Sequence, residues 1–221
     1  MTESTEYLRR IVAFALAEDI GSGDVTTRAT VPKQQKGEAV LVARQDGVLS
    51  GAEVVDAVFG ELGGDVICHW EAEDGDRLSA RQNVARFEGP LVSLLAGERV
   101  ALNFLAHMSG IATLTRRFVV AVDGHQAKIV DTRKTTPGLR HLEKYAVRCG
   151  GGENHRIGLY DMILVKENHI RSGGGLLKAT KAALQHAASA RPRLGVEVEV
   201  NSVKDAAMAT ELAVDRVMLD N

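Results

Sequence analysis

From residue 128 to the end, short apolar runs alternate with amphipathic stretches, and this alternation limits the possible folds more than any other feature of the chain. The apolar runs have the character of strands, and the stretches between them have helical spacing. The runs occupy 128–132, 161–166, 195–200 and 216–221, and the helices are expected near 139–149, 175–190 and 203–212. Strands that alternate with helices form right-handed βαβ units around a parallel sheet. The second half is therefore predicted to be an α/β array, either doubly wound or closed into a barrel.

The first half has a different pattern. A helix is predicted at 5–18, and the glycines of DIGSGD end it. Strands are expected at 38–44, 66–71 and 83–87, a helix at about 51–61, and a long helical region from 91 that Gly97, Ser109 and Gly110 are expected to interrupt. The Asp-Gly pair of EDGDRLSARQNVARFEG predicts a hairpin joint with a positive φ. We expect two domains, 1–110 and 111–221. Because the last strand has no helix after it to cover it, we also expect the sequence to be part of a longer, C-terminally extended protein.

Composition excludes several classes of protein. Apolar residues make up 45% of the chain, which is enough for a buried core. The net charge of −2 gives no reason to expect nucleic acid or an anionic membrane as a partner. The two cysteines, Cys68 and Cys149, lie far apart, so neither a disulfide framework nor a structural zinc site is expected. The start has no apolar signal core, and we expect a cytoplasmic protein.

Positive charge is concentrated in residues 128–171. This window holds nine Lys and Arg residues against five Asp and Glu residues, so it carries +4 in a chain of −2. Arg140, Lys144 and Arg148 recur at four-residue spacing, and a solvated basic stripe on one helix explains them as well as a binding site does. Arg133 and Lys134 instead follow a predicted buried strand, as does Lys166, and ligand sites of α/β folds lie at such strand ends. Cations placed there predict an anionic ligand.

Two further features lie near the same strand ends. The run Gly150-Gly151-Gly152, followed by Asn154, His155 and Arg156, is either a loop that approaches a ligand closely or an ordinary tight turn. Glu199 and Asp220 are predicted at or near strand ends on one face of the sheet, although alternation leaves open whether Glu197 or Glu199 points to the site. These carboxylates either hold a Mg²⁺ ion shared with substrate phosphates or pair with neighbouring Lys and Arg residues.

A long composite motif then identifies a family. The run DTRKTTPGLRHLEKYAVRCGGGENHRIGLYDMILVKENHI (131–170) closely resembles the signature of quinolinate phosphoribosyltransferases, also called nicotinate-nucleotide pyrophosphorylases (carboxylating). The segments EDIGSGDVTT, GVLSG, EDGD, ERVALNFLAHMSGIAT, EVEV and MLDN resemble the same family in the same order. The resemblance implies an N-terminal α/β sandwich followed by an incomplete α/β barrel. In that family further strands and glycine-rich phosphate loops follow MLDN.

The resemblance also implies a reaction and its residues. Family members transfer a phosphoribosyl group from phosphoribosyl pyrophosphate to quinolinate with decarboxylation, which yields nicotinate mononucleotide for NAD biosynthesis. They need Mg²⁺ but no organic cofactor, and they form homodimers or larger homo-oligomers. Residues that match the family's substrate-binding positions are Arg99, Thr132, Arg133, Lys134, Thr135, His155, Arg156, Lys166, Glu199 and Asp220. Catalytic roles are implied for Lys134, Lys166, Glu199 and Asp220, and metal binding for Glu199 and Asp220.

Within this set the resemblance implies individual roles. Arg133, His155 and Arg156 bind the carboxylates of quinolinate, where a guanidinium matches carboxylate geometry better than an ammonium does. Thr132 and Thr135 match hydrogen-bond donors to the ligand, but ordinary strand-end threonines would look the same. Arg99 matches an arginine that reaches into the partner's site.

Three other interpretations compete with this one. A molybdenum-associated relative of the family is the nearest alternative enzyme, and TRKTTPG with ENHRIGLYDMILVKENHI favours the quinolinate enzymes over it. The segment EDGDRLSARQNVARFEG resembles the hammerhead of biotinyl and lipoyl carrier domains, but residues 38–90 contain no lysine to carry the group. A non-catalytic assembly subunit is the third, and it rests only on the missing phosphate loops.

Overall fold

The computed structural model describes residues 3–63 and 65–220, and the chain divides into two compact units. The units are Met1–His155 and Arg156–Asn221, and each is described by itself. The domain boundary predicted at residue 110 stays a prediction.

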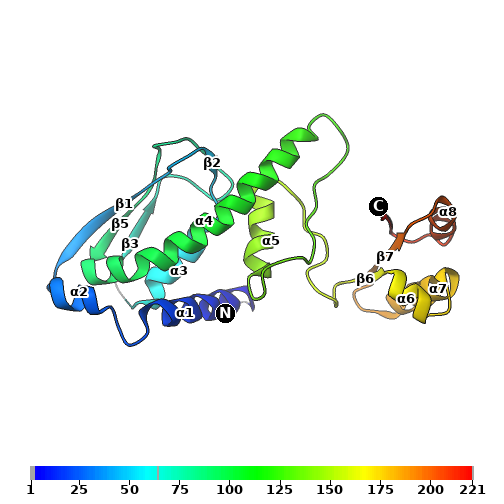
Figure 1. The fold of residues 1–221 in the computed structure, drawn as a ribbon, viewed down its shortest axis with the longest axis horizontal. Helices are drawn as coiled ribbons and strands as arrows, with labels where there is room; N and C mark the ends of the chain where they lie inside the picture. The colour runs from blue at the N-terminus through cyan, green and yellow to red at the C-terminus, as the bar shows by residue number, and fades with distance from the viewer. Residues whose placement is uncertain (1–2, 64, 221) are drawn as a thin grey trace. The chain divides into compact units, whose positions relative to one another are not determined.

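The N-terminal unit combines helices with an antiparallel sheet (Figure 1). Its elements are α1 (Glu3–Ile20), α2 (Val25–Thr30), β1 (Lys36–Val42), β2 (Gly47–Val48), α3 (Ala52–Glu61), β3 (Ile67–Trp70), β4 (Arg77–Leu78), β5 (Asn83–Pro90), α4 (Leu91–Ala121) and α5 (Arg140–Cys149). The main sheet has the order β1-β5-β3, and β2 pairs with β4 in a second, two-stranded sheet. All of these strand pairs are antiparallel.

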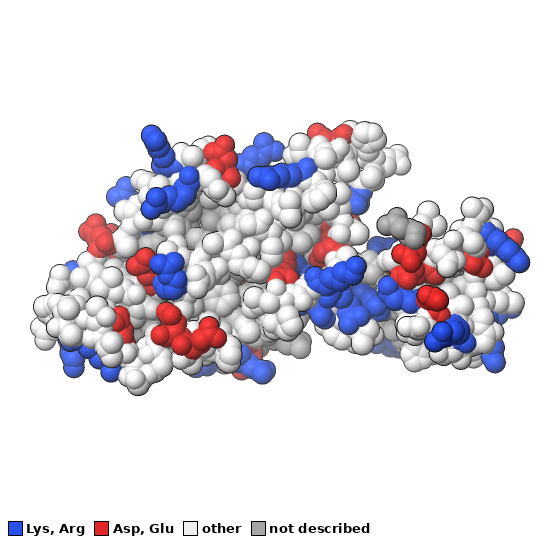
Figure 2. Space-filling model, in the orientation of Figure 1, with Lys and Arg blue, Asp and Glu red and all other residues white. Residues whose placement is uncertain are grey.

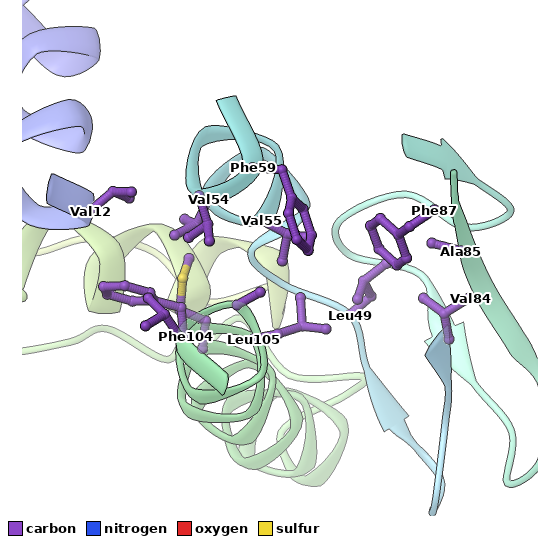
Figure 3. Packing of buried hydrophobic residues seen from close by; sticks show 14 of the residues in the cluster. Val12, Leu49, Val54, Val55, Phe59, Val84, Ala85, Phe87, Phe104 and Leu105 are labelled. Carbon is purple, nitrogen blue, oxygen red and sulfur yellow. The ribbon is translucent and has the colours of Figure 1, made fainter. Parts of the chain in front are cut away.

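One apolar core holds this unit together. Figure 3 shows Val55 and Phe59 of α3 lying between Leu105 of α4 and the strand residues Val84 and Phe87. All five side chains are buried. Because burial of each such side chain contributes about 1.5–3 kcal/mol, this contact of helices with sheet stabilises the unit substantially.

The predicted elements of this unit are largely confirmed. The structure has α1, α3, β1, β3 and β5 within a few residues of their expected bounds, and Gly75 has the expected positive φ of 99°. The short elements α2, β2 and β4 were not predicted.

The predicted interruptions of α4 are wrong, because α4 is continuous over Leu91–Ala121. Gly97 instead allows α3 to approach: a Cβ atom there would lie 2.8 Å from Phe59 Cε1 and 2.9 Å from Leu62 Cδ1. By length and composition alone α4 could cross a membrane, a test that the core helix of a soluble protein also passes. Nine of its residues are buried, and most of them belong to the apolar core.

The C-terminal unit is a parallel α/β arrangement, as predicted (Figure 1). Its elements are β6 (Met162–Val165), α6 (Glu167–Ser172), α7 (Leu176–Ser189), β7 (Gly195–Val200), α8 (Val203–Glu211) and β8 (Arg216–Leu219). The strands pair in the order β6-β7-β8, all parallel, and α7 and α8 connect them and pack on them. Only the short helix α6 was not expected.

The predicted strand at 128–132 is wrong. Val130 forms a single parallel bridge with Glu153, and two backbone hydrogen bonds join Ile129 and Asp131 to Glu153. A β-prone run becomes a strand only where a neighbouring segment offers a ladder of donors and acceptors. Within the described residues only this short segment does so.

Candidate active site

Parallel register brings three predicted site residues to one edge of the C-terminal sheet. Val165 of β6 lies opposite Val198 of β7, so the next residue, Lys166, comes beside Glu199. Asp220 follows β8 two residues after the partner of Glu199, so both carboxylates are directed to the same face. The Lys166 ammonium donates to Glu199 at 2.5 Å.

A cavity of about 260 Å³ lies at this edge. It is lined by Glu167, Ile170, Leu176, Glu199, Val200, Asn201, Asp205 and Asp220. Glu199 therefore faces the cavity, whereas Glu197 is buried and does not line it. Strand alternation could not choose between these two glutamates, and the structure places Glu199 at the cavity.

The donor chemistry of this edge fits a hard cation. Mg²⁺ is bound through one or two carboxylates together with substrate phosphates and water, and Glu199 and Asp220 supply two such groups. Glu199 already pairs with Lys166, whereas the Asp220 carboxylate has no hydrogen-bond partner among the described residues. No cluster of three or more His, Cys, Asp or Glu side chains suited to a metal occurs in residues 3–63 and 65–220.

The basic stripe of α5 is only partly a solvated face. Lys144 is only 2% exposed and pairs with Asp131. Arg148 donates to Asn154 and lies over the Tyr145 ring, and Arg140 donates to Thr135. Figure 2 shows basic and acidic side chains on both units in the face drawn. Lys144 is therefore bound inside the protein, whereas Arg148 has partners but stays exposed.

Arg133 and Lys134 differ from the cations of α5. The Nε atom of Arg133 is buried and has no hydrogen-bond partner among the described residues, and Lys134 is exposed with no ion-pair partner there. Both follow Asp131, but the buried strand that was predicted to precede them is absent: among the described residues only the single bridge of Val130 with Glu153 lies there. An arginine whose buried nitrogen lacks an acceptor is suited to bind an anion.

The neighbouring threonines stabilise this segment itself. Thr132 Oγ1 accepts from the backbone N–H of Lys134 at 3.0 Å, and Thr135 Oγ1 accepts from Arg140 Nε at 3.0 Å. These contacts match the ordinary structural interpretation of both residues, which the sequence could not separate from ligand binding.

Glu143 fixes the rest of the same loop from α5. Its buried carboxylate accepts from the backbone N–H of Thr136 at 3.2 Å and faces His107 Nε2 of α4 at 3.0 Å. Burial raises the pKa of Glu143, but the hydrogen bonds from Thr136 and His107 outweigh it and leave the pKa below its ordinary value. Tyr7 of α1 also donates to the carbonyl of Gly138 at 2.5 Å. None of these contacts was predicted, and those of His107 and Tyr7 join segments far apart in sequence.

The three glycines pack against α4. A Cβ atom on Gly150 would lie 2.5 Å from the Ala112 carbonyl oxygen, and one on Gly152 would lie 2.9 Å from Thr115 Cγ2. Gly151 has a φ of 88°. The turn therefore needs glycine for helix contact and backbone conformation, which supports the tight-turn interpretation of this run.

The remaining predicted residues are His155, Arg156 and Arg99. His155 is half-buried, and its backbone N–H donates to Asp131. Arg156 begins the C-terminal unit, where its Nη1 donates to the Met162 carbonyl at 3.3 Å. Arg99 is exposed on α4 and makes no hydrogen bond or ion pair within the described part of the chain.

Comparison with known proteins covers both halves of the chain. The family model of the quinolinate phosphoribosyl transferase C-terminal domain matches residues 111–221, and that of the N-terminal domain matches residues 24–109. The chain belongs to the quinolinate phosphoribosyltransferase family. A tobacco (Nicotiana tabacum) quinolinate phosphoribosyltransferase [decarboxylating] of this family is 40% identical over 98% of the chain.

Other relatives support the same family assignment. A probable nicotinate-nucleotide pyrophosphorylase [carboxylating] of Bacillus subtilis is 44% identical over 97% of the chain and 73% of its own length. The solved structure of NadC from Streptococcus pyogenes is 42% identical, with a TM-score of 0.93 over 100% of this chain and 76% of that one. The predicted fold class, the N-terminal and C-terminal α/β domains of this family, is confirmed. The chain spans 63% of the length of the tobacco relative.

Proposed function

We propose that this protein transfers the phosphoribosyl group of phosphoribosyl pyrophosphate to quinolinate, with loss of CO2, and so forms nicotinate mononucleotide for NAD biosynthesis. The observation that carries the proposal is the state of Arg133 in a chain of this family. Its buried Nε has no acceptor among the described residues, whereas the buried ammonium of Lys144 is paired with Asp131. A substrate with two carboxylates would supply that acceptor.

In this proposal the N-terminal unit supplies the cations for the quinolinate carboxylates. Arg133 binds a carboxylate in bidentate geometry, and Lys134 and His155 lie on the two segments that meet at Asp131. The family resemblance also implies substrate roles for Arg156 and Lys166, which belong to the C-terminal unit. Binding both carboxylates fixes the ring so that its nitrogen is held for attack.

The chemistry then requires positioning and charge stabilisation. The bond from ribose C1 to pyrophosphate breaks, an oxocarbenium-like centre develops, and the pyridine nitrogen forms the new bond with its lone pair. The resulting pyridinium withdraws electrons from the adjacent 2-carboxylate, so the bond to that carboxylate breaks, CO2 leaves, and a proton replaces it on the ring. No organic cofactor is needed for this step.

We further propose that Glu199 and Asp220 hold the Mg²⁺ of phosphoribosyl pyrophosphate. Mg²⁺ would neutralise part of the pyrophosphate charge as it leaves. The support is their position together on one cavity at the carboxyl ends of parallel strands. The pairing of Lys166 with Glu199 places a cation beside the same cavity.

The test is quinolinate-dependent release of CO2 by the protein, with Arg133→Ala as the diagnostic variant. We expect Arg133→Ala to raise the quinolinate KM roughly 10- to 100-fold, because a hydrogen bond to a charged group is worth about 1.5–3 kcal/mol. Lys128→Ala, which removes an exposed pair with Glu153, is the matched control and should leave the KM unchanged. Absence of quinolinate-dependent CO2 release from the unmodified protein would reject the function, and an unchanged KM in Arg133→Ala would reject the role of Arg133.

A further inference from the structure

A buried ion pair joins α5 to the segment that carries Arg133 and also contacts His155. The side chains of Lys144 and Asp131 are only 3% and 8% exposed, and the Lys144 ammonium donates to an Asp131 carboxylate oxygen. Asp131 also accepts from Asn154 Nδ2 at 2.6 Å and from the His155 backbone N–H at 2.8 Å. Lys144 in turn donates to the His155 carbonyl at 3.1 Å.

Stability alone does not explain such a pair. Desolvation of two charges costs several kcal/mol per ion, and apolar side chains of similar volume are often as stabilising in the same place. A buried, fully hydrogen-bonded pair can instead fix one arrangement of the groups that it joins. The next question is therefore which groups the contacts of Asp131 and Lys144 hold in place.

The ion pair and its hydrogen bonds join two segments, one ending at Asp131 and the other at His155, that have few backbone contacts with each other. Their backbones share one bridge, between Val130 and Glu153, with only two backbone hydrogen bonds. Directly after this bridge, Asp131 and His155 are linked by the side-chain cluster of Asp131, Lys144 and Asn154. The cluster continues the connection where the backbone ladder ends.

We propose that the cluster of Asp131, Lys144 and Asn154 is a positioning device that sets the segment of Arg133 against His155 for the carboxylates of quinolinate. Lys144 does not itself contact substrate, because its ammonium is buried and bound to Asp131 and the His155 carbonyl. This inference rests on the proposed function. It adds residues that affect quinolinate binding only by positioning Arg133 and His155.

The experiment compares Lys144→Met with the double variant Asp131→Asn/Lys144→Met. Lys144→Met leaves a buried carboxylate without its cation, so both the thermal midpoint and quinolinate binding should deteriorate. The double variant removes the orphan charge, so it should regain much of the thermal midpoint. It should nevertheless keep a quinolinate KM raised roughly tenfold, with the KM of phosphoribosyl pyrophosphate changed less than about twofold.

Lys128→Met is the matched control, because Lys128 pairs with Glu153 beside the same bridge but is exposed. It should change neither KM. If the double variant restores the quinolinate KM together with stability, the cluster is merely structural and the proposal is overturned. A folded Lys144→Met protein with an unchanged quinolinate KM would overturn it as well.

Amide hydrogen exchange separates this inference from the proposed function. In both variants we expect faster exchange, by roughly tenfold or more, in residues 131–136 and 153–156, with α3 and the centre of α4 unchanged. If the unmodified protein releases no CO2 from quinolinate, the proposed function fails, and the exchange data alone decide the positioning role. Unchanged exchange in both segments would reject it.

Discussion

Asp74 shows how a side chain distant in sequence can cap a helix. The residue before α3, Gly51, has a φ of 115° and no side chain to accept from the first N–H groups of the helix. Asp74 supplies the acceptor: its carboxylate receives the backbone N–H groups of Gly51 at 2.9 Å and Ala52 at 3.1 Å. Tyr145 of α5 donates to the same carboxylate at 2.8 Å, and burial together with Asp74 raises the pKa of this phenol. One carboxylate thus joins α3 to α5.

This arrangement predicts coupled losses of stability. Asp74→Ala should lower the free energy of unfolding by about 1–2 kcal/mol, the usual cost of removing a helix cap. Tyr145→Phe should lower it by about 1 kcal/mol, because one hydrogen bond is lost. Urea denaturation of the two single variants and the double variant measures both effects. In the Asp74→Ala background Tyr145→Phe should cost almost nothing, and additive losses would show that the two residues do not act together.

At the scale of elements, the contact of the glycine turn with α4 sets how closely α5 approaches α4. The turn at Gly150–Gly152 follows α5 directly, and Gly150 lies so near the Ala112 carbonyl that no side chain fits. Backbone cannot move aside as the end of a flexible side chain can. The distance between α5 and α4 therefore depends on this glycine.

Gly150→Ala should consequently destabilise the protein by about 1–3 kcal/mol through overpacking. Gly60→Ala is the matched control: Gly60 lies in α3, and a Cβ atom there would meet nothing within 4 Å. Alanine should stabilise that helix by up to about 1 kcal/mol. Urea denaturation of both variants checks the difference, and a Gly150→Ala protein as stable as Gly60→Ala would contradict the assigned contact.

Particular residues show which parts of the fold and site the sequence could predict. Lys166, Glu199 and Asp220 were expected at one edge because parallel strands direct their carboxyl ends the same way, whatever the loops do. Lys144 could not be assigned either to a solvated stripe or to a binding site, because helical spacing cannot reveal a partner, Asp131, that only the folded loop brings near. For the same reason the run at 128–132 had strand composition but lacked a neighbour to pair with.

At the scale of the whole molecule, α4 carries exposed groups that the described chain does not use. Leu95, Leu114 and Phe118 are 41%, 54% and 55% exposed, and Arg99 is exposed on the same helix. Neighbouring exposed apolar side chains are typical of protein interfaces, and Leu114 and Phe118 are four residues apart on one face of α4. We propose that this helix takes part in a homodimer in which Arg99 serves the partner's site, as the family resemblance implies.

Mixing two impaired variants, assayed with quinolinate near the KM of the unmodified protein, tests this proposal. In a heterodimer of Arg99→Ala with Arg133→Ala, one site would contain both substitutions and the other neither, because Arg99 and Arg133 of one site would come from different chains. Each variant alone should have little quinolinate-dependent CO2 release. After random reassociation of equal amounts, half of the dimers are mixed and half of their sites intact, so about a quarter of the unmodified activity should return.

The mixture separates two roles for Arg99 that a single variant cannot. If Arg99 acts in the site of its own chain, every site in the mixed dimer keeps one substitution, and activity stays at the level of the single variants. The control mixes Arg133→Ala with Lys134→Ala, two changes in one segment of one chain. Their mixed dimer also contains one substitution in each site, so mixing should restore nothing. Recovery in the first mixture and not in the control would assign Arg99 to the partner's site, whereas equal behaviour of the two mixtures would exclude that role.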